Sequence, residues 1–208
     1  MSDNPKRDVL ISKKLSYILR HGAKKENISI DNQGFVSISD ILNHQLFKSF
    51  KTTREDLNRI VLADAKNRYT IDFGADKICA NQGHSLTNVN NENLIKLSKD
   101  ELINLNIYHG TYFKKLPLIK KSGGLNKRNR NHIHFTCDSL NGQEYIRKNA
   151  NVLVYVDIEK CIEQGLEFYK SSNNVILTSG DSLGNIKWEN ISKIISLKDN
   201  NELNLDDI

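Results

Sequence analysis

The chain has 208 residues, of which 38% are hydrophobic and 26% are charged. This length suits one large domain or two small ones, and the composition offers enough apolar side chains for a core, so disorder along the whole chain is not expected. No stretch approaches the ~18 to 20 apolar residues that span a bilayer, and the polar opening MSDNPKRD is unlike a secretory signal. We therefore expect an intracellular protein, cytoplasmic or nuclear, with no membrane partner.

The charge of the chain is distributed unevenly. Thirty basic and 25 acidic residues give a net charge of +5, yet residues 102–137 hold seven basic residues and no acid, and residues 9–25 again hold no acid. The last ten residues reverse this pattern, with four acidic side chains and no basic one. Basic blocks favour a phosphate-rich ligand because neutralised phosphates release counterions, although a solvated lysine face accounts for the same charge. Three widely spaced cysteines without a CxxC pair predict reduced, mostly buried thiols.

The N-terminal half has the pattern of several helices and a pair of strands. Residues 8–20 carry apolar side chains at helical spacing, and Gly22 ends this predicted helix. Residues 28–38 alternate like a short hairpin. Short helices are expected over 39–44 and after Thr53, and RYTIDF and KICANQ then indicate two strands joined by a tight turn. This order is that of a winged helix-turn-helix, a frequent nucleic-acid-binding unit.

The C-terminal half is richer in strands. Residues 85–105 form a polar, Asn-rich stretch that we expect to be a linker with a short helix near 94–97. Strands are predicted in IYHGTY, NHIHFTC, VLVYVDI, GLEFYKS, NVILTSG and KIISL. Helices are predicted around 113–121, 140–148 and 159–164. We therefore expect an α+β protein with a first lobe over residues 1–100 and a second, β-rich lobe over residues 101–208.

Two segments of the first lobe combine residue types that suit phosphate. Arg20 and His21 follow one another where the first helix ends, and Arg68 begins a strand. An arginine fork binds phosphate and an imidazole moves protons, but basic side chains also cap helix C-termini, so both interpretations stay open. Gln82 and His84 lie in the turn of ANQGHS, where a single histidine is more often solvated than functional.

Three histidines accompany strands of the second lobe: His109, His132 and His134. A histidine in an apolar strand is costly to bury unless it is hydrogen-bonded, so three of them indicate a site. Arg130 lies just before two of them, at the end of a basic block. His109 and His134 each begin an HxT unit, the pattern of two-histidine phosphoesterases, but that alternative leaves the basic residues of the first lobe unused.

Ser171 and Asn173 precede an apolar strand in SSNNVILTSG. Their side chains can bond sugar hydroxyls or simply form a β-turn. No Walker motif, no GxGxxG after a strand, no HExxH and no GxSxG occurs in the sequence. Nucleotide hydrolysis, dehydrogenase chemistry and α/β-hydrolase chemistry therefore lose support.

Seven segments occur in a fixed order: SKKLSYILRHGA, DNQGFVSISDIL, NRYTI, ICANQGHS, YHGT, NRNHIHFT and SSNNVILTSG. Together they closely resemble the NAD-dependent RNA (tRNA) 2′-phosphotransferases, over nearly the whole chain from Arg7 to Leu197. The resemblance implies an N-terminal winged-helix RNA-binding lobe and a C-terminal ADP-ribosyltransferase-like lobe that binds NAD as a co-substrate. It also implies removal of an RNA 2′-phosphate in two steps, through an RNA-2′-phospho-ADP-ribose intermediate and without a metal.

The resemblance also implies roles for individual residues. It points to a catalytic set of Arg20, His21, Arg68 and Arg130, whose fixed charges suit a phosphate that becomes a phosphodiester and then a pentacoordinate centre. Six residues of the second lobe are expected to hold NAD: His109, Gly110, Thr111, His132, Ser171 and Asn173. The glycine among them would let the backbone approach the ligand.

The RNA is expected to contact Gln82 and His84. The chain departs from the family pattern at Cys79, where members often carry Arg, and at Lys187, where they often carry Pro. The first change could remove one RNA contact, and neither alters the four expected catalytic residues. Two other functions stay open: an ADP-ribosyltransferase that caps terminal phosphates of RNA or DNA, and a winged-helix module that binds nucleic acid without catalysis. A monomer is expected.

Overall fold

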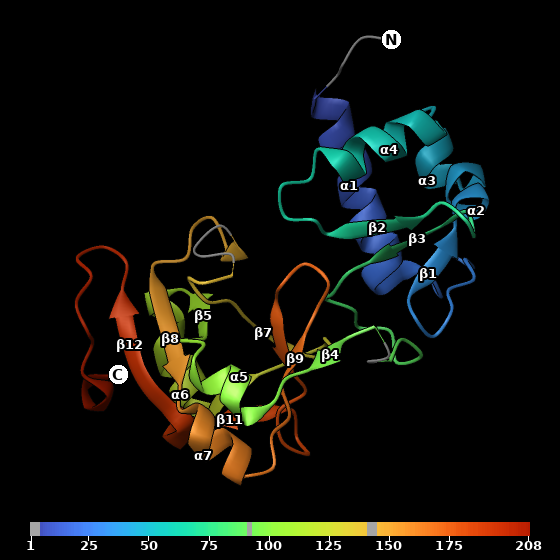
Figure 1. Cartoon of the computed structure of the whole chain (residues 1–208). Coiled ribbons are helices and arrows are strands. Elements are labelled where there is room, and N and C mark those ends of the chain that lie inside the picture. The colour runs from blue at the N-terminus through green and yellow to red at the C-terminus, as the bar shows by residue number, and fades with distance from the viewer. Residues whose placement is uncertain (1–4, 91–92, 141–144) are drawn as a thin grey trace. The chain divides into compact units, whose positions relative to one another are not determined.

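The computed structural model describes residues 5–90, 93–140 and 145–208. Helices and antiparallel strands both occur along the chain, so the expected α+β class is confirmed (Figure 1). The chain divides into two compact units, Met1–Asn93 and Leu94–Ile208. Within the described part of the chain, no helix is both long and apolar enough to cross a membrane.

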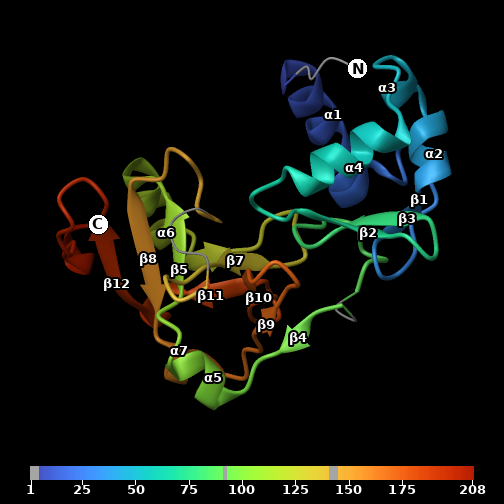
Figure 2. The same ribbon diagram turned by 45° about the horizontal axis from the view of Figure 1, so that its top comes forward.

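The first unit combines helices with a three-stranded antiparallel sheet in the order β1-β3-β2 (Figure 2). Its elements, in chain order, are α1 (Pro5–Tyr17), the π-helical turn η1 (Ile18–Gly22), β1 (Phe35–Ser37), α2 (Ile38–Asn43), α3 (Gln45–Lys48), α4 (Arg54–Leu62), β2 (Tyr69–Asp72) and β3 (Lys77–Ala80). The strands expected in RYTIDF and KICANQ are confirmed as β2 and β3, which pair with one another.

The hairpin expected over residues 28–38 is wrong. β1 pairs with β3, and the described segment that precedes it forms only a turn, closed by the Asp31 N–H to the Phe35 carbonyl at 3.0 Å, with no strand of its own. The Asp31 carboxylate accepts hydrogen bonds from the backbone N–H groups of Gln33 and Phe35 at 3.1 and 2.8 Å, which makes this segment an Asx-type turn. Gly34 suits the turn because its φ is +84°.

Helix capping and charge pairing fix α4 against α1. Thr53 caps α4 and forms a capping box, in which the Asp56 carboxylate accepts the Thr53 N–H. The same carboxylate is only 4% exposed, and Arg7 of α1 and Arg59 of α4 bind it at 2.6 and 2.7 Å. The Arg7 guanidinium holds the pKa of Asp56 well below its usual range, so this buried carboxylate stays ionised.

The core of the first unit lies between α1, α4 and the sheet. Leu15 and Leu57 are fully buried there. Tyr69 of β2 joins this core, and its hydroxyl donates to the Ser12 carbonyl of α1 at 2.8 Å. Leu86, from the stretch expected to be a linker, is buried in the same core. Apolar burial and hydrogen bonding therefore both join the helix to the sheet.

In the described residues of the second unit, antiparallel strands form three sheets, ordered β4-β9-β10-β7, β11-β6 and β12-β8-β5. Its elements, in chain order, are β4 (Ile95–Lys96), α5 (Lys99–Ile103), β5 (Tyr108–Thr111), η2 (Phe113–Lys115), α6 (Leu116–Lys121), β6 (Gly124–Asn126), β7 (Ile133–Phe135), β8 (Val152–Val156), α7 (Ile158–Glu163), β9 (Tyr169–Lys170), β10 (Ile176–Thr178), β11 (Asn185–Lys187), η4 (Trp188–Asn190), β12 (Ile191–Ser196) and η5 (Leu205–Asp207).

Most of the expected strands of this unit are present, whereas two of the expected helices are not seen as expected in the described residues. The helix expected near residues 94–97 is wrong, because this segment contains β4, which pairs with β9, and the helix α5 begins only afterwards. Part of the helix expected around 140–148 lies outside the described residues. Helices α6 and α7 confirm the other two expected helices.

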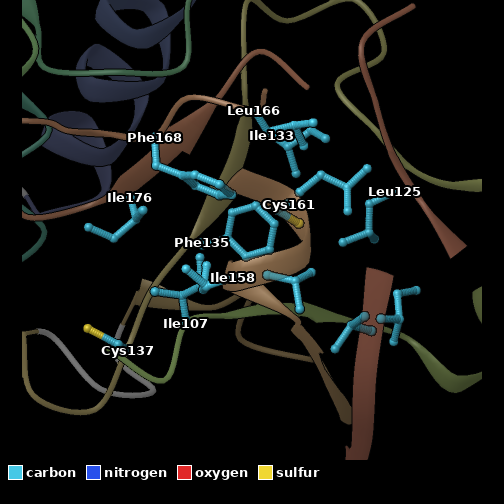
Figure 3. Close-up of a cluster of buried hydrophobic side chains, with 14 of the residues drawn as sticks. Ile107, Leu125, Ile133, Phe135, Cys137, Ile158, Cys161, Leu166, Phe168 and Ile176 are labelled. Atoms are coloured by element: carbon cyan, nitrogen blue, oxygen red, sulfur yellow. The ribbon is translucent and has the colours of Figure 1, made fainter. Parts of the chain in front are cut away.

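The core of the second unit centres on two phenylalanine rings (Figure 3). The ring centroids of Phe135 and Phe168 lie 6.4 Å apart in an edge-to-face arrangement, which aromatic rings favour. Leu125, Ile158 and Leu166 belong to the same buried cluster. The strands of this unit therefore bury one apolar cluster, and the His109 ring lies edge to face against Phe135 of that cluster.

All three cysteines are buried free thiols, as expected. Burial raises the pKa of Cys161 to about 11 and that of Cys79 to about 12. Both therefore stay protonated near neutral pH and lack the thiolate that nucleophilic chemistry requires.

Candidate active site

Arg20 and His21 lie on the π-helical turn at the end of α1. The turn is marked by a 3.1 Å bond from the Ala23 N–H to the carbonyl five residues earlier, where an α-helix would reach back four. Gly22 packs against the tyrosine ring that ends α1, and a Cβ at this position would lie 2.5 Å from that ring and force it to shift. The expected helix thus widens before it ends, and single π turns of this kind occur often at functional sites.

The turn after β3 packs on this π turn. The Ser85 N–H donates to the Arg20 carbonyl at 2.9 Å, and the Ser85 hydroxyl lies 2.9 Å from His21 Nδ1. Gly83, with a φ of +89°, lets its backbone approach the Arg20 guanidinium, since a Cβ there would lie 3.4 Å from Nε. Arg20 Nε and Nη2 are buried, whereas His21 is exposed. The fold therefore brings Arg20 and His21 together with the ANQGHS turn.

Arg68 is held just before β2. Its backbone N–H donates to Asp64 Oδ2 at 2.5 Å, and its guanidinium pairs with the other oxygen of the same carboxylate. Its carbonyl accepts the Asn81 N–H at 2.9 Å, which sets Arg68 beside the residue that precedes Gln82. The π turn contacts β3. The candidate residues of the first unit therefore lie around one end of the β2–β3 pair.

His84 packs into the first unit rather than away from it. A Cβ on Gly34 would lie 3.0 Å from His84 Nε2, and that nitrogen is buried. Gln82 and His84 are both half-buried side chains. His84 therefore packs against the turn around Gly34, within residues 28–38, and the RNA contacts expected of Gln82 and His84 stay predictions.

In the second unit, one ring nitrogen of His109 on β5 is hydrogen-bonded to the backbone. Nδ1 is 2.9 Å from the His134 carbonyl, and because a carbonyl only accepts, Nδ1 carries the proton. Burial lowers the pKa of His109, the hydrogen bond to His134 opposes this, and the positive charges of Arg147 and Arg130 lower it further. The ring is therefore neutral near pH 7, with Nε2 as its acceptor.

Arg130 lies in the exposed loop between β6 and β7, and its N–H donates to the Lys127 carbonyl at 3.1 Å. Partial desolvation of its guanidinium and the charge of Arg147 both lower the pKa of Arg130, yet a guanidinium stays protonated at neutral pH. The charge of Arg147 thus acts on Arg130, and both charges act on His109. Sequence reasoning missed Arg147, which belongs to none of the seven ordered segments. Its position next to Lys148 in the sequence is a weak signal of a basic site.

Gly110 makes room for a side chain of its own unit. A Cβ at position 110 would lie 2.7 Å from Cβ and Cγ2 of Ile146. Packing of Ile146 therefore accounts for the glycine without a ligand, and close approach of NAD to Gly110 stays a prediction. Thr111 is buried at the end of β5, where its carbonyl accepts the Asn151 N–H at 3.0 Å.

The remaining NAD candidates are buried at opposite ends of β10. Ser171 and Asn173 form the turn before β10, where the Ser171 hydroxyl donates to Asn173 Oδ1 at 2.8 Å and accepts the Val175 N–H at 3.1 Å. These bonds fit the β-turn interpretation. His132 precedes β7, and the antiparallel pairing of β7 with β10 sets it near the other end of β10. Burial lowers the pKa of His132 to about 4, so this ring is neutral near pH 7.

The two HxT units do not present both imidazoles to one face of the sheet. Tyr108 pairs with Thr136 across neighbouring strands, and this register sets His109 opposite Phe135, with the two rings edge to face. Successive residues of a strand project to opposite faces. His134, next to Phe135 in the chain, therefore points away from the face that carries His109. This arrangement argues against the two-histidine phosphoesterase.

Residues 6–180 match the family described as RNA 2'-phosphotransferase, Tpt1 / KptA family. The chain belongs to this family. It is 35% identical over 210 residues to the tRNA 2'-phosphotransferase of Saccharomyces cerevisiae, an alignment that covers 95% of this chain and 89% of the relative. It is 37% identical over 187 residues to tRNA 2'-phosphotransferase 1 of Danio rerio, covering 86% and 81%. The family expected from the seven segments is thereby confirmed.

A probable RNA 2'-phosphotransferase of the bacterium Trichormus variabilis is 36% identical over 172 residues, covering 82% of this chain and 91% of the relative. All candidate residues of this RNA 2'-phosphotransferase family member fall within residues 6–180, whereas the acidic tail after Asp199 follows the matched region. The arrangement offers two kinds of chemistry. Guanidinium groups can neutralise a phosphate, and neutral imidazoles can bond hydroxyl groups.

Proposed function

We propose that this family member removes the splice-junction 2′-phosphate of tRNA and transfers it to NAD. The observation that carries the proposal is the match to one phosphotransferase family over residues 6–180, which include every candidate residue. Relatives from yeast and fish that bear the name tRNA 2'-phosphotransferase support tRNA as the substrate. NAD is the co-substrate that the sequence resemblance implies, and neutral histidines of the second unit suit its ribose hydroxyls.

In the first proposed step, an oxygen of the RNA 2′-monophosphate attacks the anomeric carbon of the nicotinamide riboside. The bond from that carbon to the nicotinamide nitrogen breaks, and nicotinamide leaves as a neutral molecule with the electron pair. The product is an RNA-2′-phospho-ADP-ribose diester. We assign Arg20, Arg68 and Arg130 to the phosphate oxygens, because guanidinium forks hold a dianion and have no readily lost proton.

In the second proposed step, the adjacent ribose 2″-hydroxyl attacks the phosphorus. The bond from phosphorus to the RNA 2′-oxygen breaks; the attacking hydroxyl loses one proton and the leaving oxygen gains one. The products are RNA with a 2′-hydroxyl and ADP-ribose 1″,2″-cyclic phosphate. His21, which is exposed on the π turn, is the proposed proton carrier, and the arginines offset charge on the pentacoordinate phosphorus.

We assign RNA binding to the first unit and NAD binding to the second. Helices followed by the β2–β3 pair occur in the first unit in the order of a winged helix, which supports an RNA-binding role. The antiparallel, strand-rich second unit is compatible with an ADP-ribosyltransferase-like lobe. We further propose that the protein acts as a monomer in the cytoplasm or nucleus, without a metal or a membrane.

Incubation with a 2′-phosphorylated oligoribonucleotide and NAD tests this function. We expect loss of the 2′-phosphate, equimolar release of nicotinamide, and ADP-ribose 1″,2″-cyclic phosphate detected by mass spectrometry. The same oligonucleotide with a 2′-hydroxyl, and a reaction without NAD, are the matched controls. The proposal fails when neither 2′-phosphate loss nor nicotinamide release occurs.

Two other outcomes would favour the functions left open by the sequence. Consumption of NAD with a 5′-phosphorylated strand, leaving a stable ADP-ribosylated strand, would indicate a capping ADP-ribosyltransferase. Salt-dependent binding of nucleic acid without any consumption of NAD would indicate a binding module.

A further inference from the structure

The turn after β3 holds a serine to which none of the proposed roles is assigned. Ser85 Oγ lies 2.9 Å from His21 Nδ1 and 3.5 Å from the Arg20 carbonyl oxygen. The Ser85 backbone N–H donates to the same carbonyl at 2.9 Å. Because this backbone bond does not depend on the side chain, it anchors position 85 to the π turn and fixes the hydroxyl against the imidazole.

The single proton of the Ser85 hydroxyl restricts how these contacts can be made. The Arg20 carbonyl only accepts, so both contacts are satisfied when Ser85 donates to this carbonyl and accepts a hydrogen bond from His21 Nδ1–H. A neutral His21 then carries its lone pair on Nε2. A protonated His21 keeps the same bond to Ser85, so the arrangement serves both states of a proton carrier.

We propose that Ser85 is a positioning residue that fixes the Nδ1–H tautomer of His21 and makes Nε2 the nitrogen that exchanges the proton during turnover. The role rests on the proposed function, which assigns that proton transfer to His21. A hydrogen bond to one ring nitrogen decides which nitrogen is left to react.

Nitrogen-15 NMR of the full chain, without RNA or NAD, reads the tautomer directly. We expect neutral wild-type His21 to show a protonated Nδ1 and an unprotonated Nε2. Ser85→Ala should shift the ring toward a mixture of tautomers, whereas Ser85→Thr, which keeps the hydroxyl, should preserve the wild-type pattern. Ser29→Ala changes an exposed serine of the same unit and is the matched control. A wild-type pattern in Ser85→Ala would overturn the proposal.

Turnover of a 2′-phosphorylated oligoribonucleotide gives the second readout. We expect Ser85→Ala to lower kcat by about 10- to 100-fold with a smaller change in KM, and Ser85→Thr to restore most of the loss. The alanine variant keeps the backbone bond to Arg20, so its thermal unfolding temperature should match the wild type. An equal fall of kcat in both variants, or a change in KM alone, would also overturn the positioning role.

The two readouts separate this inference from the proposed function. A wild-type chain that shows no turnover with RNA and NAD contradicts the proposed function. The tautomer of His21 in the wild type and in Ser85→Ala still decides whether Ser85 orients the ring.

Discussion

The two units present their candidate groups in different electrostatic states. In the first unit, Arg20 is a cation whose guanidinium is largely buried, and His21 is exposed beside it. In the second unit, burial lowers the pKa of His109 and of His132, so both rings are neutral near pH 7. A charged site suits a phosphate and a neutral site suits sugar hydroxyls. The contrast therefore agrees with the proposal that the first unit binds the RNA phosphate and the second unit binds NAD.

Arg130 is the one expected site residue of the second unit that carries a charge. It is a cation near the neutral His109 ring, and desolvation of its guanidinium, followed by the charge of Arg147, lowers its pKa. Two like charges held near one another raise the energy of the protein without ligand, and an anionic ligand would relieve that cost. Arg130 and Arg147 therefore place positive charge near His109, which would favour an anionic ligand there.

The largest expected effect concerns the two separate cores. Phe47 is fully buried in the first unit and Phe135 in the second. We expect Phe47→Ala and Phe135→Ala each to cost about 3–5 kcal/mol, because each leaves a cavity. Hydrogen exchange should show lost amide protection mainly in the unit that holds the substitution. Equal loss of protection in both units from either variant would contradict independent cores.

Substitution of Arg130 tests whether its charge contributes to turnover. Arg130→Ala should lower turnover by about 100- to 1000-fold, the range seen when a fixed group that stabilises the transition state is removed. Arg128→Ala is the matched control, because Arg128 is an exposed arginine of the same loop. Arg130→Lys should recover little activity, since lysine lacks the planar fork. Initial rates of 2′-phosphate removal measure all three variants. An equal fall in rate for Arg128→Ala and Arg130→Ala would show that Arg130 contributes only general positive charge.

The neutral state of the buried His132 ring should make the stability of the protein depend on pH. Burial lowers the pKa of His132 to about 4, below the ~6.5 of an unfolded histidine. As pH falls from 7 to 5, the unfolded chain binds a proton that the folded chain does not, so this group removes about 2 kcal/mol of stability. Urea unfolding at both pH values should show a smaller difference in His132→Asn. An unchanged difference would mean that His132 titrates normally in the folded protein.

Local patterns in the sequence predicted the elements whose determinants lie close together in the chain. The capping signal at Thr53 and the strands on either side of Gly74 were both predictable, because a cap and a tight turn involve neighbouring residues. The partner of β1 was not, because its pairing with β3 joins residues far apart in the chain. Alternation in residues 28–38 favoured the nearer, incorrect partner.

The site was predictable to a similar degree. The seven ordered segments marked Arg20 and His21, but residue spacing alone does not show the π turn that holds them or the tyrosine ring packed against Gly22. Arg147 lies in no motif, and only the structure shows that its charge acts on His109. Ser85 was part of a recognised segment, yet its bond to His21 spans distant parts of the chain and required the fold.

The two capping boxes give the finest comparison between the units. Thr53 caps α4 with Asp56 as its partner, and Ser98 caps α5 with Glu101. Asp56 is buried and bound by two arginines, whereas Glu101 is exposed. We therefore expect Thr53→Ala to cost about 1–2 kcal/mol and Ser98→Ala about 0.5 kcal/mol in urea unfolding. Thr53→Ser and Ser98→Thr keep the cap and should cost less. Equal costs for the two alanine variants would show that the cap bond alone, and not the buried carboxylate behind it, sets the energy.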